Sequence, residues 1–315
     1  MTYTKGILSF VTLLTAAIAL AGTSSADGPT LRIGVQKYGT LVVVRAQQGL
    51  EHRLQHQVSS IEWTEFPAGP QLLEAMAAGS IDFGTTGEAP PIFAQAGGKG
   101  LVYVGVERPA PKGEAILVPK DSPIQKIAEL KGKKVALNKG SNVHYLLVRA
   151  LASAGLTPAD IESVYLAPAD ARAAFERGAV DAWAIWDPYL SAAEAATSAR
   201  ELTNGEGLVA NRQFYLASPK FAQAQPALVR AILDEIDRTD AWAATHVNET
   251  AEQLSPATGL SVPVLQTALG RLPFGAGPVD DGIVHDQQQI ADTFYGLGLI
   301  PKPIVVRDIV WTPHS

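Results

Sequence analysis

The sequence predicts a two-lobed α/β protein with a ligand cleft between its lobes. Three observations lead to this prediction. Short apolar strands alternate with helices over the first two thirds of the chain, the alternation restarts near residue 114, and the segment 107–113 before that point is rich in proline and glycine. Alternating strands and helices form parallel sheets joined by crossover helices. A second series of such units therefore indicates a second lobe.

The first series contains four strand-like segments and three helix-like segments. Its strands are expected at 31–35, 58–63, 81–84 and 101–106, and its helices from about 41 and at 70–78 and 89–96. Pro70 stands in the first turn of its helix, where a missing N–H group is tolerated.

The second series repeats this order, and the last third of the chain is helical. Its strands are expected at 114–118, 134–137, 164–166 and 180–185, with helices at 143–154 and 168–177. The final helices are expected at 225–247, 262–272 and 283–297.

Two crossings between the lobes are expected, one at 107–113 and one near 217–219. Lobe one is then built from both ends of the chain, and lobe two from the middle. The expected domains are a signal peptide at 1–26, lobe one at 27–112 and 218–315, and lobe two at 113–217. A cleft between two such lobes is a common place for small ligands.

The first 26 residues have the pattern of a secretory signal. Lys5 supplies a positive start, residues 6–22 carry no charge, and small residues precede a cleavage site expected after Ala26, with Ala21 as the alternative. The apolar stretch is shorter than the ~20 residues that span a bilayer, which disfavours a membrane anchor. The chain has no cysteine, hence no disulfide and no lipid attachment site. We expect a soluble monomer in the periplasm.

The charge of the chain argues against a nucleic-acid partner. The net charge is −6, and removal of the signal with its single Lys5 leaves about −7. A phosphate-binding surface needs clustered lysine and arginine. An anionic ligand must therefore be held by local dipoles and hydrogen bonds.

Four strand-to-helix loops carry the polar residues that could hold such a ligand. They are expected at 36–40, 84–88, 138–142 and 185–189, and they are rich in Gly, Ser, Thr, Asn or Gln. Ligands of open parallel sheets bind beyond the carboxyl ends of the strands. Helix starts expose free N–H groups and a partial positive charge, and glycine permits close approach. Facing one cleft, these loops would form an anion site that needs no metal and no cofactor.

Simpler roles for the same residues remain open at this point. Thr86, Ser141 and Asn142 could be ordinary helix N-caps. Trp186 could line the pocket or belong to the core. Asp187 is better suited to a helix cap or a hinge contact than to an anion, because like charges repel.

Several catalytic and nucleotide-binding patterns are missing. Thr40 stands where a P-loop requires lysine, and no G-x-G-x-x-G follows the first strand. No G-x-S-x-G motif occurs, which disfavours that class of serine hydrolase. His52 and His56 are one helical turn apart, but their polar neighbours indicate an exposed face rather than a metal site.

Four stretches resemble the aliphatic sulfonate-binding proteins of ABC importers, and the likeness extends over 31–311. They are Phe-Pro-Ala-Gly-Pro-Gln at 66–71, the glycine-rich loop and helix at 84–95, Pro-Ala-Asp-Ala-Arg-Ala-Ala-Phe at 168–175, and the Trp-Asp-Pro element at 181–189. The resemblance implies a type II periplasmic binding fold, a sulfonate bound at the lobe interface and a membrane-embedded ABC permease as partner.

The resemblance also implies the ligand contacts. The sulfonate would be held by Gln36, Thr85, Thr86, Gly87, Ser141 and Asn142, and the alkyl side would be framed by Trp186, Asp187 and Tyr215. Two residues depart from the family pattern. Tyr38 is bulkier than expected in the first loop, and Asn142 replaces what is often a second serine, so the preferred alkyl length stays open.

Two other functions remain alternatives. The ligand could be taurine, nitrate, a sulfate ester or an aromatic sulfonate, since relatives of the same superfamily share the loop chemistry. A secreted enzyme on this scaffold is the second alternative. The loops supply mainly neutral hydrogen-bonding groups, and the pyrimidine-synthesising relatives use cysteine, which this chain lacks.

Overall fold

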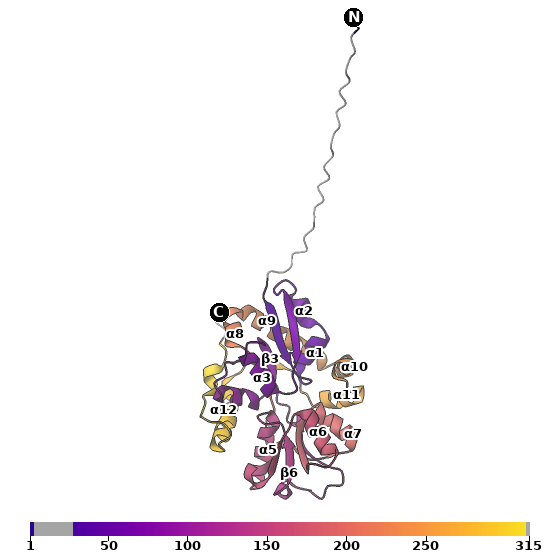
Figure 1. The fold of residues 1–315 in the computed structure, drawn as a ribbon, viewed down its shortest axis with the longest axis vertical. Coiled ribbons are helices and arrows are strands. Elements are labelled where there is room, and N and C mark those ends of the chain that lie inside the picture. Colours follow the sequence, from indigo (N-terminus) through magenta and orange to yellow (C-terminus); the bar gives the residue numbers. More distant parts are fainter. Residues whose placement is uncertain (3–27, 313–315) are drawn as a thin grey trace.

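The computed structural model describes residues 1–2 and 28–312. The predicted signal segment, apart from its first two residues, and its cleavage site lie outside the described residues. Within 28–312, two sheets form the centres of two lobes, which lie one above the other in Figure 1. The α/β fold with two lobes and two crossings is confirmed.

Lobe one is built on a six-stranded sheet of order β11-β4-β10-β3-β1-β2. Its strands are β1 Thr30–Val35, β2 Ser60–Glu65, β3 Phe83–Gly87, β4 Val102–Glu107, β10 Gln213–Ala217 and β11 Ala276–Gly277. Its helices are α1 Thr40–Ala46, α2 Gly49–Leu54, α3 Gly69–Ala77, α4 Ala89–Ala96, α8 Pro219–Ala224, α9 Pro226–Ala243, α10 Val247–Thr258, α11 Val262–Gly270 and α12 Asp281–Gly296, with a 3-10 turn η4 Val306–Ile309.

Lobe two is built on a five-stranded sheet of order β7-β6-β8-β5-β9. Its strands are β5 Glu114–Val118, β6 Lys134–Leu137, β7 Glu162–Tyr165, β8 Ala182–Trp186 and β9 Arg200–Asn204. Its helices are α5 Asn142–Ser153, α6 Pro168–Glu176 and α7 Tyr189–Thr197, and its 3-10 turns are η1 Pro111–Gly113, η2 Ile127–Leu130 and η3 Pro158–Asp160.

The sheets are mixed, not wholly parallel as the alternation predicted. In lobe one, β10 runs antiparallel to both β3 and β4, and in lobe two β5 runs antiparallel to both β8 and β9. Strands β5 and β10 are each the first strand that the chain forms after crossing from the other lobe, whereas the two-residue β11, also antiparallel to β4, comes later in lobe one. A strand that enters from the hinge runs away from it, whereas its neighbours end near it.

The place of strand β10 in the sheet shows that the second crossing lies earlier in the chain than expected. Because β10 pairs with two strands of lobe one, the chain has already returned to that lobe at Gln213, and the connection between the lobes is the segment 205–212. The boundary expected at 217 falls at the end of β10. The residues of β10 show no local pattern that distinguishes this short buried strand from a helix.

The helix expected at 225–247 is α9, which ends four residues earlier, and it is followed by α10, a helix that was not expected. Helix α9 ends after Ala243, where Thr245 Oγ1 and His246 Nδ1 both lie within hydrogen-bonding distance of Trp242 O, at 3.0 and 2.8 Å. Side chains that bond to nearby backbone groups compete with the helix ladder. The chain then restarts as α10.

The central strands are covered on both faces. Every residue of β3, β5, β8 and β10 is buried, whereas β2 and β7 at the sheet edges are partly exposed. This difference explains why the central strands are continuous apolar or small-residue runs without polar alternation. Among the described residues, no helix is both long enough and apolar enough to traverse a bilayer.

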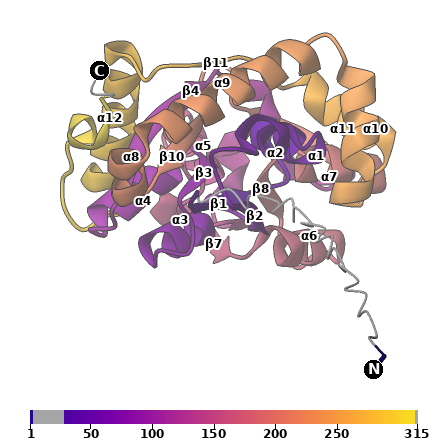
Figure 2. The ribbon, with the colours of Figure 1, turned by 90° about the horizontal axis from the view of Figure 1, so that it is seen from above.

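The C-terminal helices of lobe one reach the second lobe at two ends of the molecule. In Figure 2, α10 and α11 lie at one end and α12 at the other. Helix α11 packs against α7, and α4, which packs beside α12, contacts α5. The cleft therefore has one contact region on each side.

Candidate functional site

The strand-end segments of the two lobes meet at the interface. A Cβ atom placed on Gly87 would lie 2.8 Å from Asn142 Cβ, and one on Gly140 would lie 3.5 Å from the ring of Phe93. Gly87 and Phe93 belong to lobe one, and Asn142 and Gly140 to lobe two. The second and third predicted loops therefore touch across the cleft, and the lobes are closed.

Lobe one contributes an amide and two hydroxyl groups. Gln36 Nε2 donates to Thr85 O at 2.9 Å, which fixes the loop after β1 against β3. The Thr86 hydroxyl donates to Gly87 O at 3.0 Å, while the Thr85 hydroxyl has no partner among the described residues. Both threonines are fully buried. A buried hydroxyl without a partner costs ~1–3 kcal/mol, a cost that a bound acceptor would remove.

Thr85 and Thr86 are strand residues, not loop residues as expected. The pairing of β10 with β3 extends the ladder from Phe83 to Gly87. Helix α4 then begins with Ala89-Pro90-Pro91. Proline has no N–H group, so this helix start offers few amide donors. On this side of the cleft the threonine hydroxyls are the better donors.

Lobe two contributes the start of α5. Ser141 precedes this 12-residue helix and is 1% exposed. Its hydroxyl donates to Asn138 O at 2.7 Å and makes no capping bond to the helix. The first-turn N–H groups of a helix have no partner within it, and they carry a partial positive charge. The capping alternative is wrong for Ser141, and no capping bond of Thr86 is found at α4 either.

The side-chain amide of Asn142 bonds to residues in or beside the two crossings between the lobes. Its Nδ2 group donates to the Glu114 carboxylate and, at 3.1 Å, to Asn211 Oδ1. Asn211 in turn donates to Ala110 O at 2.8 Å. Asn142 therefore links the third loop to both crossings. Its predicted contact with the ligand stays a prediction, and the free donor it has for this purpose is its backbone N–H.

Trp186 and Asp187 lie at the end of β8. Trp186 is 5% exposed, and its ring meets that of Tyr189 edge-on at 6.1 Å. The Asp187 N–H donates to Gly113 O at 2.8 Å, and its carboxylate accepts from the Ser191 N–H and hydroxyl at 3.0 and 2.6 Å. Asp187 thus bonds to the start of α7 through its carboxylate and to the end of the first crossing through its N–H group.

Tyr215 lies within β10, opposite Thr85. Its hydroxyl donates to Glu107, and its ring stacks on Phe83 with 6.2 Å between centroids. These contacts place it beside β3 as a support of the strand that carries Thr85. Its contact with an alkyl chain stays a prediction.

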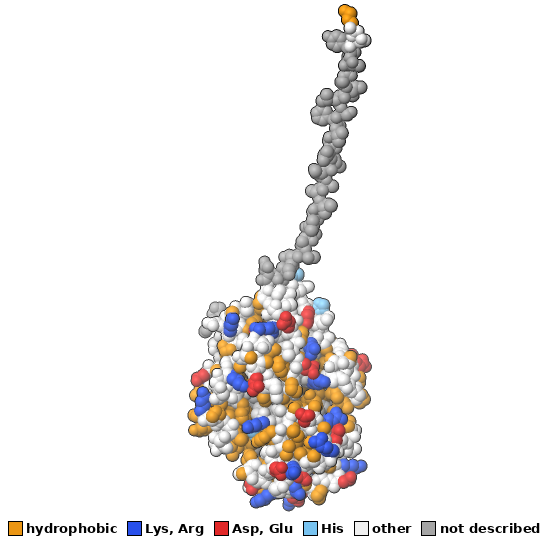
Figure 3. Space-filling view, viewed as in Figure 1, with side chains coloured by type: hydrophobic (Ala, Val, Ile, Leu, Met, Phe, Trp, Pro, Cys, Tyr) orange, Lys and Arg blue, Asp and Glu red, His pale blue; other side chains and the backbone are white. Residues whose placement is uncertain are grey.

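Carboxyl groups surround the cleft although the predicted ligand is an anion. Glu88, Glu107, Glu114 and Asp187 are all at most 4% exposed. Burial raises the pKa of Glu88 to about 7 and the pKa of Glu114 well above its ordinary value. Lysine, arginine and acidic residues are interspersed over the outer face in Figure 3. The raised pKa values reduce the negative charge that a bound anion would meet.

Arg271 forms hydrogen bonds between the two lobes at the end of the molecule where α11 packs against α7. From lobe one it donates to Glu194 Oε2 at 2.8 Å, to Ser191 Oγ at 3.1 Å and to Asp187 Oδ2 at 3.4 Å. Its side chain is 20% exposed and that of Asp187 is fully buried. Because all three acceptors belong to lobe two, these bonds exist only while the lobes are closed.

Replacing Arg271 by alanine is expected to weaken ligand affinity about tenfold, because apparent affinity falls with the fraction of closed molecules. Calorimetric titration would measure this loss. Arg172→Ala is the matched control, since its bond to Glu176 lies within α6. Equal affinities for both variants would show that the Arg271 contacts do not favour closure.

His144 of lobe two contacts lobe one at the opposite end of the molecule. Its ring stacks on Phe93 of α4 at 6.0 Å and lies 5.7 Å from Phe294 of α12. Its Nδ1 atom accepts from the Gly140 N–H at 3.2 Å. Burial, with a smaller contribution from the charge of Lys139, lowers the pKa of His144 from 6.5 to about 4. The closed interface therefore requires a neutral imidazole.

This requirement predicts a pH dependence of binding. Below pH 6.5 an opened His144 takes up a proton that the closed form accepts only near pH 4. Affinity should fall between pH 6.5 and 4, by at most tenfold per pH unit, and should not change through His144 above pH 6.5. Titrations of wild type and of His144→Asn, which keeps an acceptor for Gly140, would test this. Equal pH profiles for the two proteins would exclude His144 as the cause.

Sequence reasoning missed several residues at this interface. Glu107 and Glu114 could have been found from the sequence, because each stands at the end of an apolar strand and a buried charge needs a partner. The sequence gives no such indication for Asn211, Arg271 and His144, because the residues that they contact across the interface lie far away along the chain.

Comparison with known proteins gives consistent matches. The profile of the family described as NMT1/THI5 like matches residues 64–250. A protein of Escherichia coli (strain K12) described as an aliphatic sulfonates-binding protein is 47% identical over 310 residues, covering 98% of this chain and 94% of that protein.

Two solved structures are similar over almost the whole fold. The alkanesulfonate-binding protein SsuA from Xanthomonas axonopodis pv. citri, bound to MOPS, has a TM-score of 0.87 at 44% identity and covers 91% of this chain and 99% of its own. The periplasmic aliphatic sulphonate binding protein SsuA from Escherichia coli has a TM-score of 0.83 at 46% identity, with coverages of 92% and 94%.

Proposed function

Since the chain belongs to the NMT1/THI5-like family and, within it, to the aliphatic sulfonate-binding proteins, we propose that it captures alkanesulfonates in the periplasm and delivers them to the membrane permease of an ABC importer. In this role the protein binds and releases its ligand unchanged. The periplasmic location follows the similar Escherichia coli structure and the predicted signal segment.

One observation carries the choice of an oxyanion ligand. Gly87 of lobe one lies against Asn142 of lobe two, and the hydrogen-bond donors next to these two residues support the proposal: the Thr85 hydroxyl, which has no partner among the described residues, the Thr86 hydroxyl, and the start of α5 behind Ser141. A tetrahedral sulfonate presents three oxygen acceptors and fits donors that arrive from both sides. Hydroxyl groups rotate freely, so Thr86 and Ser141 can turn from backbone carbonyls to a sulfonate oxygen.

The expected affinity follows from these donors. Each hydrogen bond to a charged group contributes ~1.5–3 kcal/mol. Four or five such bonds, less the cost of immobilising the ligand, leave about −8 kcal/mol, which corresponds to a micromolar dissociation constant. Neither a metal nor a cofactor is needed for this estimate.

Calorimetric titration with linear alkanesulfonates of two to eight carbons is the direct test. We expect micromolar binding for at least one member. No heat with any member, for a protein whose thermal unfolding shows that it is folded, would refute the proposal. Thermal-shift measurements with taurine, nitrate, an alkyl sulfate and an aromatic sulfonate separate the alternative ligands, since any ligand of the native state raises the melting temperature.

A further inference from the structure

Tyr38 occupies the middle of the closed interface. It follows β1 in lobe one, its side chain is 7% exposed, and its hydroxyl has no hydrogen-bond partner among the described residues. A Cβ atom placed on Gly113 would lie only 2.5 Å from this hydroxyl. Gly113 is the last residue before the first strand of lobe two. The phenol ring therefore extends across the gap from one lobe to the other.

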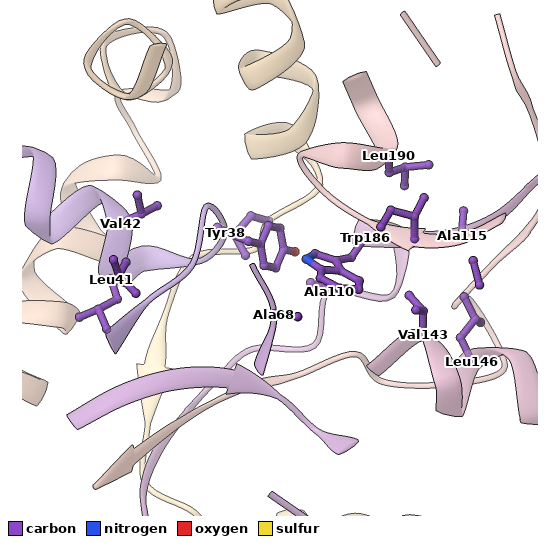
Figure 4. Close-up of a cluster of buried hydrophobic side chains, with 14 of the residues drawn as sticks. Tyr38, Leu41, Val42, Ala68, Ala110, Ala115, Val143, Leu146, Trp186 and Leu190 are labelled. Carbon is purple, nitrogen blue, oxygen red and sulfur yellow. The ribbon is translucent and has the colours of Figure 1, made fainter. Parts of the chain in front are cut away.

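Figure 4 shows the surroundings of the ring. The phenol points toward Trp186, and Ala68 and Ala110 lie beside it. Trp186 ends the strand whose following loop carries Asp187, and all these residues are buried. The two aromatic rings, one from each lobe, thus face each other inside the interface.

An apolar cavity lies on another side of Tyr38. Its volume is about 20 Å³, and besides Tyr38 it is lined by Lys37, Gly39, Val42, Pro188, Leu254, Leu265, Ala268, Leu269 and Leu272. These residues come from the loop after β1, from α1, from the start of α7 and from α10, α11 and the turn after it. A cavity of this size holds about one water molecule or one methyl group. Apart from Lys37, whose ammonium group donates to Thr258 O at 3.0 Å, the side chains of the lining are apolar and match a hydrocarbon.

We propose that Tyr38 determines which alkyl lengths the protein accepts, by forming the wall between the sulfonate-binding loops and this leucine-lined cavity. The inference rests on the proposed function and specifies its substrate class. With Tyr38 in place, the cavity accepts at most the end of a short chain. Without the ring, its space joins the cavity and forms an apolar channel that a longer chain can fill.

The substitutions Tyr38→Ala and Tyr38→Leu test this role. Each methylene group that enters an apolar site strengthens binding about fourfold. We therefore expect the affinity for octanesulfonate relative to ethanesulfonate to rise at least tenfold in Tyr38→Ala, and less in Tyr38→Leu, which fills part of the space. Tyr38→Phe is the matched control, since it removes the hydroxyl and keeps the ring, and it should retain the wild-type ratio of octanesulfonate affinity to ethanesulfonate affinity.

Calorimetric titration of wild type and the three variants with ethane-, butane-, hexane- and octanesulfonate gives the result, with thermal unfolding as the check that each variant is folded. If Tyr38→Ala does not fold, Tyr38→Leu decides. An unchanged ratio of octanesulfonate affinity to ethanesulfonate affinity in the folded variants would overturn the role of Tyr38 while leaving the proposed function intact. A wild type that binds none of the four would instead refute the proposed function.

Discussion

Alanine at both Thr86 and Ser141 is expected to weaken alkanesulfonate binding by about 100-fold. Each hydroxyl now donates to a nearby backbone carbonyl, at 3.0 Å for Thr86 and 2.7 Å for Ser141. In the complex each would donate to the sulfonate instead. A hydrogen bond to a charged group contributes ~1.5–3 kcal/mol, and 1.4 kcal/mol corresponds to a tenfold change in affinity. The loss is measured by calorimetric titration.

The control for this prediction is a second pair of hydroxyl groups that also donate to nearby backbone carbonyls. Ser153 donates to Ala150 O at 2.7 Å and Thr197 to Ala193 O at 2.8 Å, both at the ends of helices in lobe two. Ser153→Ala with Thr197→Ala should leave affinity unchanged. Both double variants should keep a melting temperature near that of the wild type. Unaltered affinity in the Thr86 and Ser141 variant would mean that these hydroxyls serve only their backbone carbonyls.

Alanine at Gly87 is expected to prevent closure and to reduce affinity by at least 30-fold. The new Cβ would lie 2.8 Å from Asn142 Cβ and 3.1 Å from its Cγ. Asn142 cannot move aside, because its amide is bonded to Glu114 and Asn211 and its backbone begins α5. The lobes must therefore stay apart, and ligand contacts from the second lobe are lost. The closed fraction, and with it the apparent affinity, falls.

Small-angle scattering and calorimetry together test this effect. Wild type should become more compact when the ligand is added, since the ligand binds the closed state better. Gly87→Ala should show no compaction and should keep its stability without ligand. Gly270→Ala is the control, because a Cβ there would meet no atom within 4 Å. Ligand-induced compaction of Gly87→Ala would show that the interface can adjust to the methyl group.

The local features of this protein were readable from its residues. Strands β5 and β6 begin and end where the apolar pattern predicted, and Pro70 and Pro168 mark the first turns of α3 and α6. The two lobes and the first crossing followed from the same alternation. These features depend on interactions within a few residues, which is the range that periodicity and proline geometry describe.

The choice among roles for the polar loop residues required the tertiary structure. Asn142 looked like a cap or a ligand contact, yet its amide is bonded to two residues that lie 28 and 69 positions away. Ser141 precedes its helix as a cap would, but its hydroxyl turns back to Asn138. Which hydrogen-bond partner a side chain takes depends on what the fold brings within about 3 Å of it.

The sequence alone therefore determined the α/β class, the two lobes and the donor-rich strand ends, because each follows from short-range order along the chain. Only the tertiary structure decided that β10 runs antiparallel to its neighbours, that the second crossing precedes it, that Arg271 and His144 contact the opposite lobe, and that Tyr38 spans the gap. The physical reason is that pairing partners and side-chain contacts form between segments up to 221 positions apart, and such contacts leave no periodic pattern in either segment.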